Sequence, residues 1–307
     1  MDHRSVKTFR VYMQARQAYR EQDFPSAIDK LIRIPVRLQN RDVNHLLVKS
    51  LYHDHKYQLA EDFMMPTLNT YPDSWALVRL MLQVFIKNHD FIKAREAVAV
   101  FNNAPVKRKS LLLIRKAESA VQRTDLKGIQ RLTDRFYHLA DQSFVKQRRI
   151  WAQAMKLPLS DFVKIARRLL VDPFLRPLMR LSVLEVLRKV KISGKVEYRG
   201  LDHRRYDIKI DQLVGLTRMR SYRQVMRIVD RGYSANPVNA LILKQNLRLE
   251  LSYLYPFDDQ KIRSPQLWVK IADLMLKGEQ PLLNNARVKR IYALQLKLNR
   301  LTDQLKR

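Results

Sequence analysis

The sequence predicts an all-α fold, an α-solenoid of helix-turn-helix repeats with a small β-hairpin insertion near residues 195–210. An aromatic residue is followed three positions later by alanine at 24–27, 57–60 and 91–94, in steps of 33 and 34 residues. Self-similarity at such a period is typical of helical solenoids. Only 6 Gly and 12 Pro occur in 307 residues, so long flexible linkers are not expected. Period-2 alternation near residue 200 predicts the hairpin.

The first third of the chain reads as three helix pairs, at residues 6–35, 41–70 and 74–102. Pro25 suits the first turn of a helix, where its missing N–H has no intrahelical partner. Ser74 is a good N-cap residue for a helix that begins at Trp75. The small side chains of the repeated alanines let the two helices of each pair approach closely. These alanines are Ala27, Ala60 and Ala94.

The later segments are less regular. Residues 110–138 form a weaker fourth unit, in which Ile129 takes the place of the alanine. Further helices are expected at 143–170, 178–191, 211–231, 236–253, 267–278 and 284–306. The predicted organisation is therefore helix-turn-helix repeats at 1–138, further helical repeats at 139–192, the hairpin at 193–211 and a C-terminal helical region at 212–307.

The hairpin prediction rests on alternation on both sides of Gly200. Val196 and Tyr198 alternate with charged residues before it, and Tyr206 and Ile208 do so after it. Alternation of this kind flanking a short polar turn is typical of two antiparallel strands. Because an isolated hairpin is marginally stable in water, we expect this one to dock on the helices.

The repeated residues resemble the tetratricopeptide repeat (TPR) family. With repeats that start at Thr8, Arg41 and Trp75, the family's alanine of position 20 falls on the three alanines named above. Its aromatic residue of position 17 falls on Phe24, Tyr57 and Phe91, and its closing proline on Pro72. Ala15 alone retains the small residue of position 8. The resemblance covers about the first 105 residues, and the whole chain is similar to uncharacterised TPR-type proteins of low-GC Gram-positive bacteria.

The resemblance implies a groove lined by the first helix of each pair. Its candidate residues mix tyrosine with Arg and Lys, a combination suited to an extended acidic peptide or to stacked single-stranded bases. Arg16 and Lys49 stand where the chaperone-binding members carry asparagines, which argues against a chaperone tail. The alternative is that the tyrosines only cover the inner helix surface. The groove candidates are Tyr12, Arg16, Tyr19, Arg20, Lys49, Tyr52, Arg79 and Lys87, with Phe9, Asp42, His45, His53, Ala76, Gln83 and Ile86 at further groove positions.

The charge balance is strongly basic, with 59 Lys+Arg against 29 Asp+Glu and a net charge of +30. Such a field attracts polyanions. Residues 146–191 hold twelve Lys or Arg and three acids, a net of +9. Spacings of 3, 4 and 4 place four more arginines on one helical face, where they suit phosphate groups. A solvated basic face is the alternative. These candidate phosphate-binding residues are Arg220, Arg223, Arg227 and Arg231.

No pattern supports catalysis or a cofactor. The chain has no cysteine, which excludes disulfides and Cys-based metal sites. Glycines are scattered singly, so no phosphate-binding glycine loop is present. His55 and His89 occupy the same position of successive repeats, which favours turn residues over metal ligands. The pair Asp258–Asp259 is interpreted as a solvated turn. We therefore expect no enzyme, no metal and no cofactor.

The function predicted from these features is a non-catalytic protein-interaction scaffold that holds an extended, acidic partner segment in a TPR-like groove. The alternative is an RNA- or ribosome-associated factor that uses the basic surface after residue 145. No apolar run approaches the roughly 18 residues of a membrane span, and the N-terminal segment lacks the apolar core of a signal peptide. We accordingly expect a cytoplasmic protein with no membrane partner and no small-molecule substrate.

Overall fold

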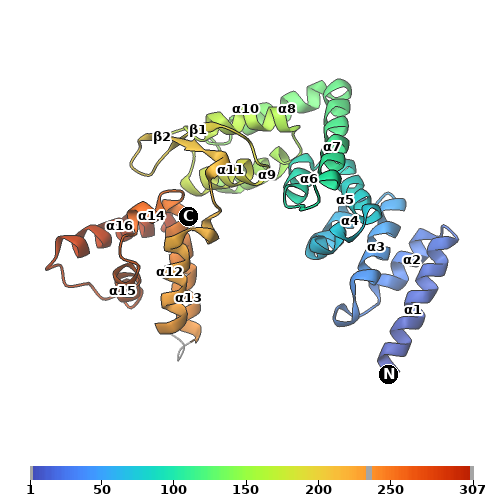
Figure 1. The fold of residues 1–307 in the computed structure, drawn as a ribbon, viewed down its shortest axis with the longest axis horizontal. Coiled ribbons are helices and arrows are strands. Elements are labelled where there is room, and N and C mark those ends of the chain that lie inside the picture. The colour runs from blue at the N-terminus through green and yellow to red at the C-terminus, as the bar shows by residue number, and fades with distance from the viewer. Residues whose placement is uncertain (1–2, 233–236, 305–307) are drawn as a thin grey trace. The chain divides into compact units, whose positions relative to one another are not determined.

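The computed structural model describes residues 3–232 and 237–304 (Figure 1). Within these residues it contains sixteen α-helices and a single two-stranded antiparallel sheet, which confirms the predicted helical class and the hairpin. The chain divides into two compact units. The first holds the chain up to Phe136 together with Trp151–Phe162, and the second holds Tyr137–Ile150 and the chain from Val163 onward. No described helix has both the length and the apolar character needed to cross a membrane.

The first unit is built mainly from consecutive helix pairs, as the sequence predicted. Its helices are α1 (His3–Arg20), α2 (Phe24–Ile32), α3 (Arg41–His53), α4 (Tyr57–Met64), α5 (Trp75–Lys87), α6 (Phe91–Ala99), α7 (Ala104–Thr124) and most of α8 (Leu126–Tyr137). Parts of α9 (Phe144–Ala154) and α10 (Leu159–Leu169) belong to it as well. The repeated alanines are fully buried between these helices. Ser74 caps α5 as expected, since its side chain accepts a hydrogen bond from the N–H of Leu77 at 3.3 Å.

The turns of the three pairs share one backbone geometry. Gln22, His55 and His89 have φ angles of 62°, 58° and 61° and lie 33 and 34 residues apart. In each turn the next residue donates its N–H to the carbonyl five positions back, at 2.9, 2.9 and 2.8 Å. This is the left-handed helix ending known as the Schellman motif. The fourth pair departs from it, because α7 ends at Asp125 with a φ of −134°.

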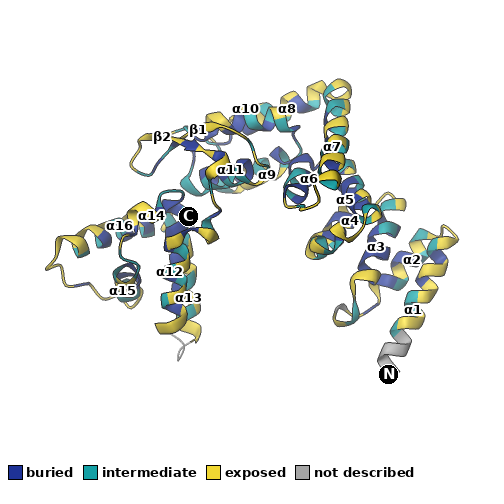
Figure 2. Cartoon of the chain, in the orientation of Figure 1, coloured by how far each residue is buried: buried dark blue, intermediate teal, exposed yellow. Residues whose placement is uncertain are grey.

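The second unit combines the hairpin with helices that do not repeat. After α11 (Pro177–Lys189) come β1 (Lys195–Arg199) and β2 (Arg205–Lys209), followed by α12 (Arg220–Gly232), α13 (Pro237–Leu254), α14 (Asp258–Lys261), α15 (Pro265–Leu276) and α16 (Ala286–Asp303). The predicted ends at Asn236 and Lys306 lie outside the described residues. An apolar core joins α12, α13, α15 and α16 around the fully buried Trp268, Leu247 and Leu251. Figure 2 shows buried and exposed residues alternating along these helices.

The hairpin forms around the predicted turn and docks on the helices. Val196 pairs with Ile208 and Tyr198 with Tyr206 on its inner face, and the first three are buried. Its outer face carries like charges opposite each other, such as Glu197 opposite Asp207. Hydrogen bonds to β1 come from several helices, including one of 3.1 Å from Nη1 of Arg180 to the carbonyl of Arg199. Packing of one face against the helices therefore stabilises this two-stranded sheet, as further strands would stabilise a larger one.

Candidate functional site

A line of aromatic rings crosses the turn ends of the first two helix pairs. The ring of His53 stacks on Phe24 at 5.1 Å and meets Tyr19 at 5.8 Å and Tyr52 at 5.6 Å. Tyr52 in turn contacts Tyr57 at 5.4 Å. We call these five residues the aromatic strip. Each ring is half-buried or exposed, so the strip is a surface feature and not part of the interior.

Two cations from the third pair lie beside the aromatic strip. Nζ of Lys87 is 5.6 Å from the centre of the Tyr57 ring, a cation–π distance. Burial raises the pKa of Tyr52, the Tyr57 hydroxyl adds to the rise, and the charge of nearby Arg79 opposes it. Four predicted groove residues are thus brought into one neighbourhood: Tyr19, Tyr52, Arg79 and Lys87.

The other predicted groove residues have separate surroundings. Tyr12 lines a hollow of about 260 Å³ with Phe9 and Asp42. Arg16 and Arg20 are exposed on α1, and Lys49 is half-buried on α3.

His45 was wrongly expected in the groove. It is buried, with Nε2 2.7 Å from the Thr70 hydroxyl and its ring 4.8 Å from Tyr71. Burial lowers the pKa of this imidazole. His45 therefore packs inside the first unit and cannot contact a ligand in the groove.

The arginines of α12 are all exposed, as their spacing predicted. The opposite face of this helix is buried through Ser221, Val225 and Val229. Within the described residues, the side chains of Arg223, Arg227 and Arg231 form no ion pair. The arginine face is therefore open to solvent and to an anionic partner.

The pair Asp258–Asp259 is not a solvated turn, contrary to the sequence interpretation. Asp258 is fully buried and accepts a hydrogen bond of 2.7 Å from the hydroxyl of Ser221. Asp259 accepts from the backbone N–H of Ser221 at 2.6 Å and of Arg220 at 3.3 Å. Together the two carboxylates cap the first turn of α12. Their role is structural, because Asp259 satisfies N–H groups that a helix start leaves free and Asp258 holds the side chain of Ser221.

The basic segment 146–191 is less uniform than its composition indicated. Arg180 is buried, and its Nη2 donates to the carbonyls of Asp172 and Leu175 at 2.6 and 2.9 Å. Arg188 is paired with Glu185 at 2.8 Å. Lys156 donates to the carbonyl of Asn88 at 3.1 Å within the first unit. Some cations of the predicted basic surface therefore bind backbone carbonyls or a carboxylate of the protein itself.

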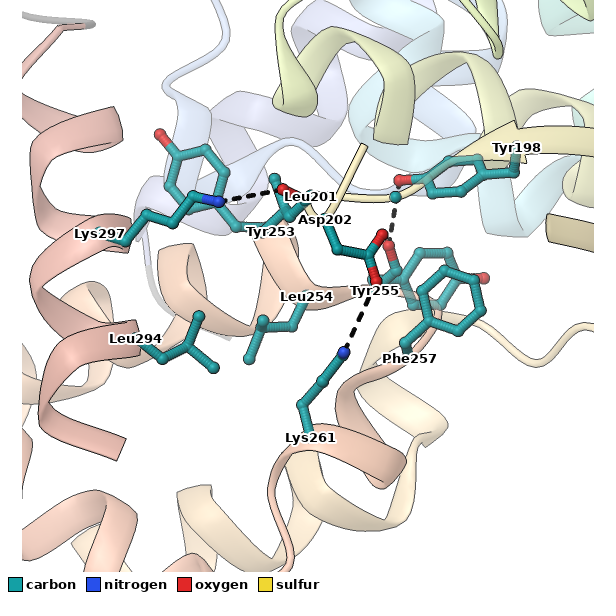
Figure 3. A pocket seen from close by; sticks show the side chains of 11 residues that line it. Tyr198, Leu201, Asp202, Tyr253, Leu254, Tyr255, Phe257, Lys261, Leu294 and Lys297 are labelled. Atoms are coloured by element: carbon teal, nitrogen blue, oxygen red, sulfur yellow. Dashed lines mark hydrogen bonds and ion pairs between the residues drawn. The ribbon is translucent and has the colours of Figure 1, made fainter. Parts of the chain in front are cut away.

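A small pocket of about 120 Å³ lies where the hairpin turn meets α13 and α16 (Figure 3). The hydroxyl of Tyr198 donates to the carbonyl of Tyr255 at 3.2 Å, and Lys297 donates to the carbonyl of Leu201 at 3.0 Å. Lys261 lies 3.9 Å from the carboxylate of Asp202. Burial raises the pKa of Tyr198 to about 12. These polar groups of the pocket are hydrogen-bonded or ion-paired with one another. The pocket is therefore part of the contact by which the hairpin packs against the helices.

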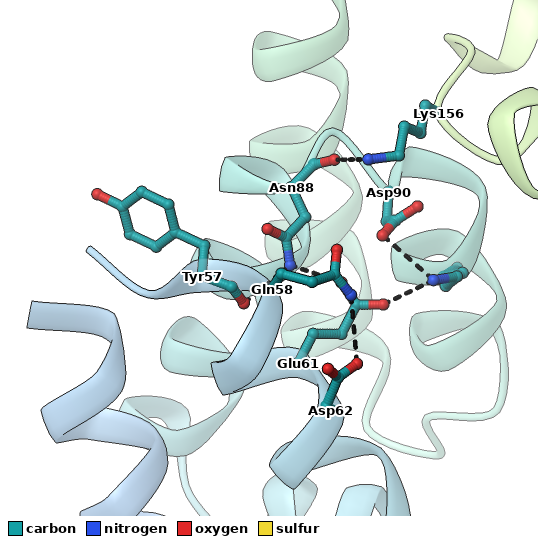
Figure 4. Close-up of polar contacts among 8 residues, drawn as sticks. Tyr57, Gln58, Glu61, Asp62, Asn88, Asp90 and Lys156 are labelled. Atoms are coloured by element: carbon teal, nitrogen blue, oxygen red, sulfur yellow. Dashed lines mark hydrogen bonds and ion pairs between the residues drawn. The ribbon is translucent and has the colours of Figure 1, made fainter. Parts of the chain in front are cut away.

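A buried ionic cluster joins the second and third helix pairs (Figure 4). Nζ of Lys93 lies 2.7 Å from Glu61 and 3.2 Å from Asp90, and both carboxylates are 2% exposed. Asn88 donates to Glu61 at 2.7 Å and to the carbonyl of Tyr57 at 2.9 Å. Burial raises the pKa of Asp90 and the neighbouring Glu61 adds to the rise, while Lys93 opposes it. This cluster stabilises the contact between repeats.

A larger hollow of about 720 Å³ lies between the loop after α14 and the start of α16. Its charged lining consists of four cations, Lys261, Arg263, Arg287 and Arg290. We call this hollow the basic pocket. Sequence reasoning missed it because the two pairs of cations lie in different helical segments. The only signal was the spacing of Arg287 and Arg290, which places them one turn apart on a helix.

No protein-family model, curated protein or solved structure matches the chain. The described residues also contain no group of three His, Asp or Glu side chains arranged to hold a metal ion.

Proposed function

We propose that this protein is a non-catalytic, TPR-like interaction scaffold whose first unit binds an extended, acidic segment of a partner protein. The observation that carries the proposal is the aromatic strip with Lys87 and Arg79 beside it. The equivalent turn geometry of three successive helix pairs supports the solenoid interpretation. Repeated units of this kind present an extended surface along which a peptide can lie.

The chemistry of the strip favours this class of ligand. Tyrosine rings offer large contact areas at a low entropy cost, because few side-chain torsions must be fixed. The neighbouring ammonium and guanidinium groups attract carboxylates of the bound segment. Aromatic residues at the centre of an interface commonly contribute more than about 1 kcal/mol each. Loss of a central tyrosine should therefore weaken binding by roughly tenfold.

A second candidate function is supported by the arginines of α12. They are exposed and form no ion pair within the described residues, apart from the interaction of Arg220 with Asp259. Arg binds phosphate groups in a bidentate manner, so this face suits an RNA backbone, including that of the ribosome. Such binding would be independent of sequence and would weaken steeply with salt.

A pull-down with the tagged full-length chain tests the two functions against each other. Partners are captured at low and moderate salt, with and without nuclease, by the wild type, Tyr52→Ala and the control Tyr137→Ala, which replaces an exposed tyrosine outside the strip. The scaffold proposal predicts a protein partner that resists nuclease and is lost only with Tyr52→Ala. Partners lost with nuclease would contradict it and favour RNA binding.

A further inference from the structure

We propose that the basic pocket of the second unit binds the phosphate chain of a small molecule, of the class of nucleoside di- and triphosphates. This site is separate from the aromatic strip, which lies in the first unit. It is also separate from the arginine residues of α12, none of which lines the pocket. The inference goes beyond the scaffold function, and its test does not depend on that function.

Four positive charges converge on the pocket from two parts of the chain. Lys261 and Arg263 come from the end of α14 and the loop after it, and Arg287 and Arg290 come from the first turns of α16. No Asp or Glu is among the residues that line the pocket. A di- or triphosphate carries several negative charges in a compact chain, which matches this arrangement. Guanidinium groups can bind such oxygens through paired hydrogen bonds.

The cations of the pocket have few competing partners. Lys261 has one, the carboxylate of Asp202, at 3.9 Å. In the described part of the chain, the side chains of Arg263, Arg287 and Arg290 form no ion pair or hydrogen bond. Like charges gathered around a hollow repel one another, and a bound polyanion relieves that repulsion. Among the described residues, an anion at this position would therefore compete with an internal carboxylate only at Lys261.

The backbone around the pocket adds to its positive character. Ser264 and Asn285 precede α15 and α16, and both line the hollow. Helices of 12 and 18 residues thus begin at its wall. The start of a helix carries partial positive charge from its free N–H groups. The Ser264 side chain makes no capping hydrogen bond, which leaves its hydroxyl available to a ligand.

The size and floor of the pocket indicate more than a single phosphate. Its volume of about 720 Å³ falls within the range of roughly 300–1,000 Å³ that is typical of small-molecule sites. The apolar lining beside the cations is Leu294, which is half-buried, and the buried Trp268 and Ile291 contribute to the wall. Trp268 is held in place by a 2.7 Å hydrogen bond from its Nε1 to Glu250. The phosphate chain would meet the cations, and an organic group such as a base would lie against the apolar side.

Calorimetric titration of the full-length protein at moderate salt tests the site. The probes are inorganic tripolyphosphate, ATP, AMP and a short single-stranded oligonucleotide. We expect tripolyphosphate and ATP to bind saturably, with AMP at least about tenfold weaker because it presents one phosphate. In Arg287→Gln/Arg290→Gln, affinity for ATP should fall by about tenfold or more, since the variant loses two guanidinium groups that form charge-assisted hydrogen bonds with phosphate oxygens.

The matched control is Arg123→Gln/Arg131→Gln, which removes the same charge from two exposed arginines of α7 and α8. It should change ATP affinity less than about twofold, and circular dichroism should show that both variants are folded. The proposal is overturned if neither tripolyphosphate nor ATP binds saturably, or if the control weakens ATP as much as the pocket variant does. It is also overturned if only the oligonucleotide binds, because the ligand would then be a nucleic acid backbone.

Discussion

Buried carboxylates have different partners in the two units. In the first unit, Glu61 and Asp90 hold the ammonium group of Lys93. In the second unit, Glu250 accepts hydrogen bonds only from the neutral groups of Trp268 and Gln295, at 2.7 and 3.1 Å. Glu61 of the repeats thus has a cation within 3 Å, whereas Glu250 of the C-terminal core has no ion pair among the described residues.

In the described part of the second unit, the buried acids have no cation beside them, and burial therefore acts strongly on their pKa values. Burial raises the pKa of Glu250 to about 7 and that of Asp258 to about 6, so both acids tend toward the neutral form inside the protein. They do not neutralise the arginines of α12 or of the basic pocket. In the first unit Lys93 lies against carboxylates and Lys87 against a ring, and in the second unit Arg188 is likewise paired with Glu185 while the arginines at 223, 227 and 231 of α12 stay exposed. A basic composition therefore produces two kinds of cationic surface.

The largest expected effect comes from removing Glu250. Glu250→Ala leaves the Trp268 indole and the Gln295 amide without their acceptor and opens a cavity, so we expect a loss of about 3 kcal/mol in the free energy of unfolding. Glu250→Gln retains an acceptor oxygen and should cost less than about 1 kcal/mol. Urea unfolding, with hydrogen exchange of α13, α15 and α16, measures both. Equal losses for the two variants would contradict this role.

The same residue predicts a pH dependence of the second unit. Folding raises the pKa of Glu250 from 4.5 to about 7, so the folded chain holds this proton more tightly than the unfolded chain. Its contribution to the free energy of unfolding therefore falls by up to roughly 3 kcal/mol as pH rises from about 4.5 to about 7. Above that range the contribution no longer changes with pH. Unfolding at a series of pH values should show a shallower dependence in Glu250→Gln. If the pH dependence of stability is the same in Glu250→Gln as in the wild type, groups other than Glu250 cause it.

A smaller loss is expected from the ionic cluster of the first unit. Lys93→Ala leaves Glu61 and Asp90 buried together without their cation, and we expect a loss of about 2 kcal/mol, reduced from the fully buried case because Lys93 is partly exposed. The loss should shrink at acidic pH, where Asp90, with its raised pKa, binds a proton. Lys116→Ala, an exposed lysine on α7, is the matched control. Equal unfolding curves for the two variants would show that the cluster adds nothing.

The smallest expected effect tests the repeated turn. Gln22 is exposed and has a φ of 62°, a conformation that glycine adopts without the steric cost of a side chain. Gln22→Gly should raise the free energy of unfolding of the first unit by up to about 1 kcal/mol. Gln22→Ala should not, because alanine retains the Cβ. A stability gain with alanine as large as with glycine would mean that the turn geometry is not the cause.

Periodicity in the sequence was sufficient to predict the helix pairs, the hairpin and the exposed arginine face of α12. Each depends on spacing along a single segment. The repeated Phe24, Tyr57 and Phe91 marked the three turns, and alternation around Gly200 marked the strands. Such patterns give the class of structure and the face on which a residue lies.

The spacing of residues along the sequence could not predict which other segments pack on a given face of a helix. His45 occupies a groove position by its number in the repeat, but Tyr71 and Thr70 from the following segment enclose it. Arg180 was counted as surface charge, and it is buried against backbone carbonyls. The basic pocket brings Arg263 together with Arg287 and Arg290, although the whole of α15 separates them in the sequence. These outcomes depend on tertiary contacts between segments that are distant in sequence.

The central claim is that the aromatic strip, and not net positive charge, binds an acidic segment. The most direct measurement is fluorescence anisotropy of a labelled acidic peptide titrated with the wild type, with Tyr52→Ala/Lys87→Gln and with Arg287→Gln/Arg290→Gln. We predict roughly tenfold weaker binding or more for the strip variant only. Equal weakening in the pocket variant, or no weakening in the strip variant, would contradict the claim.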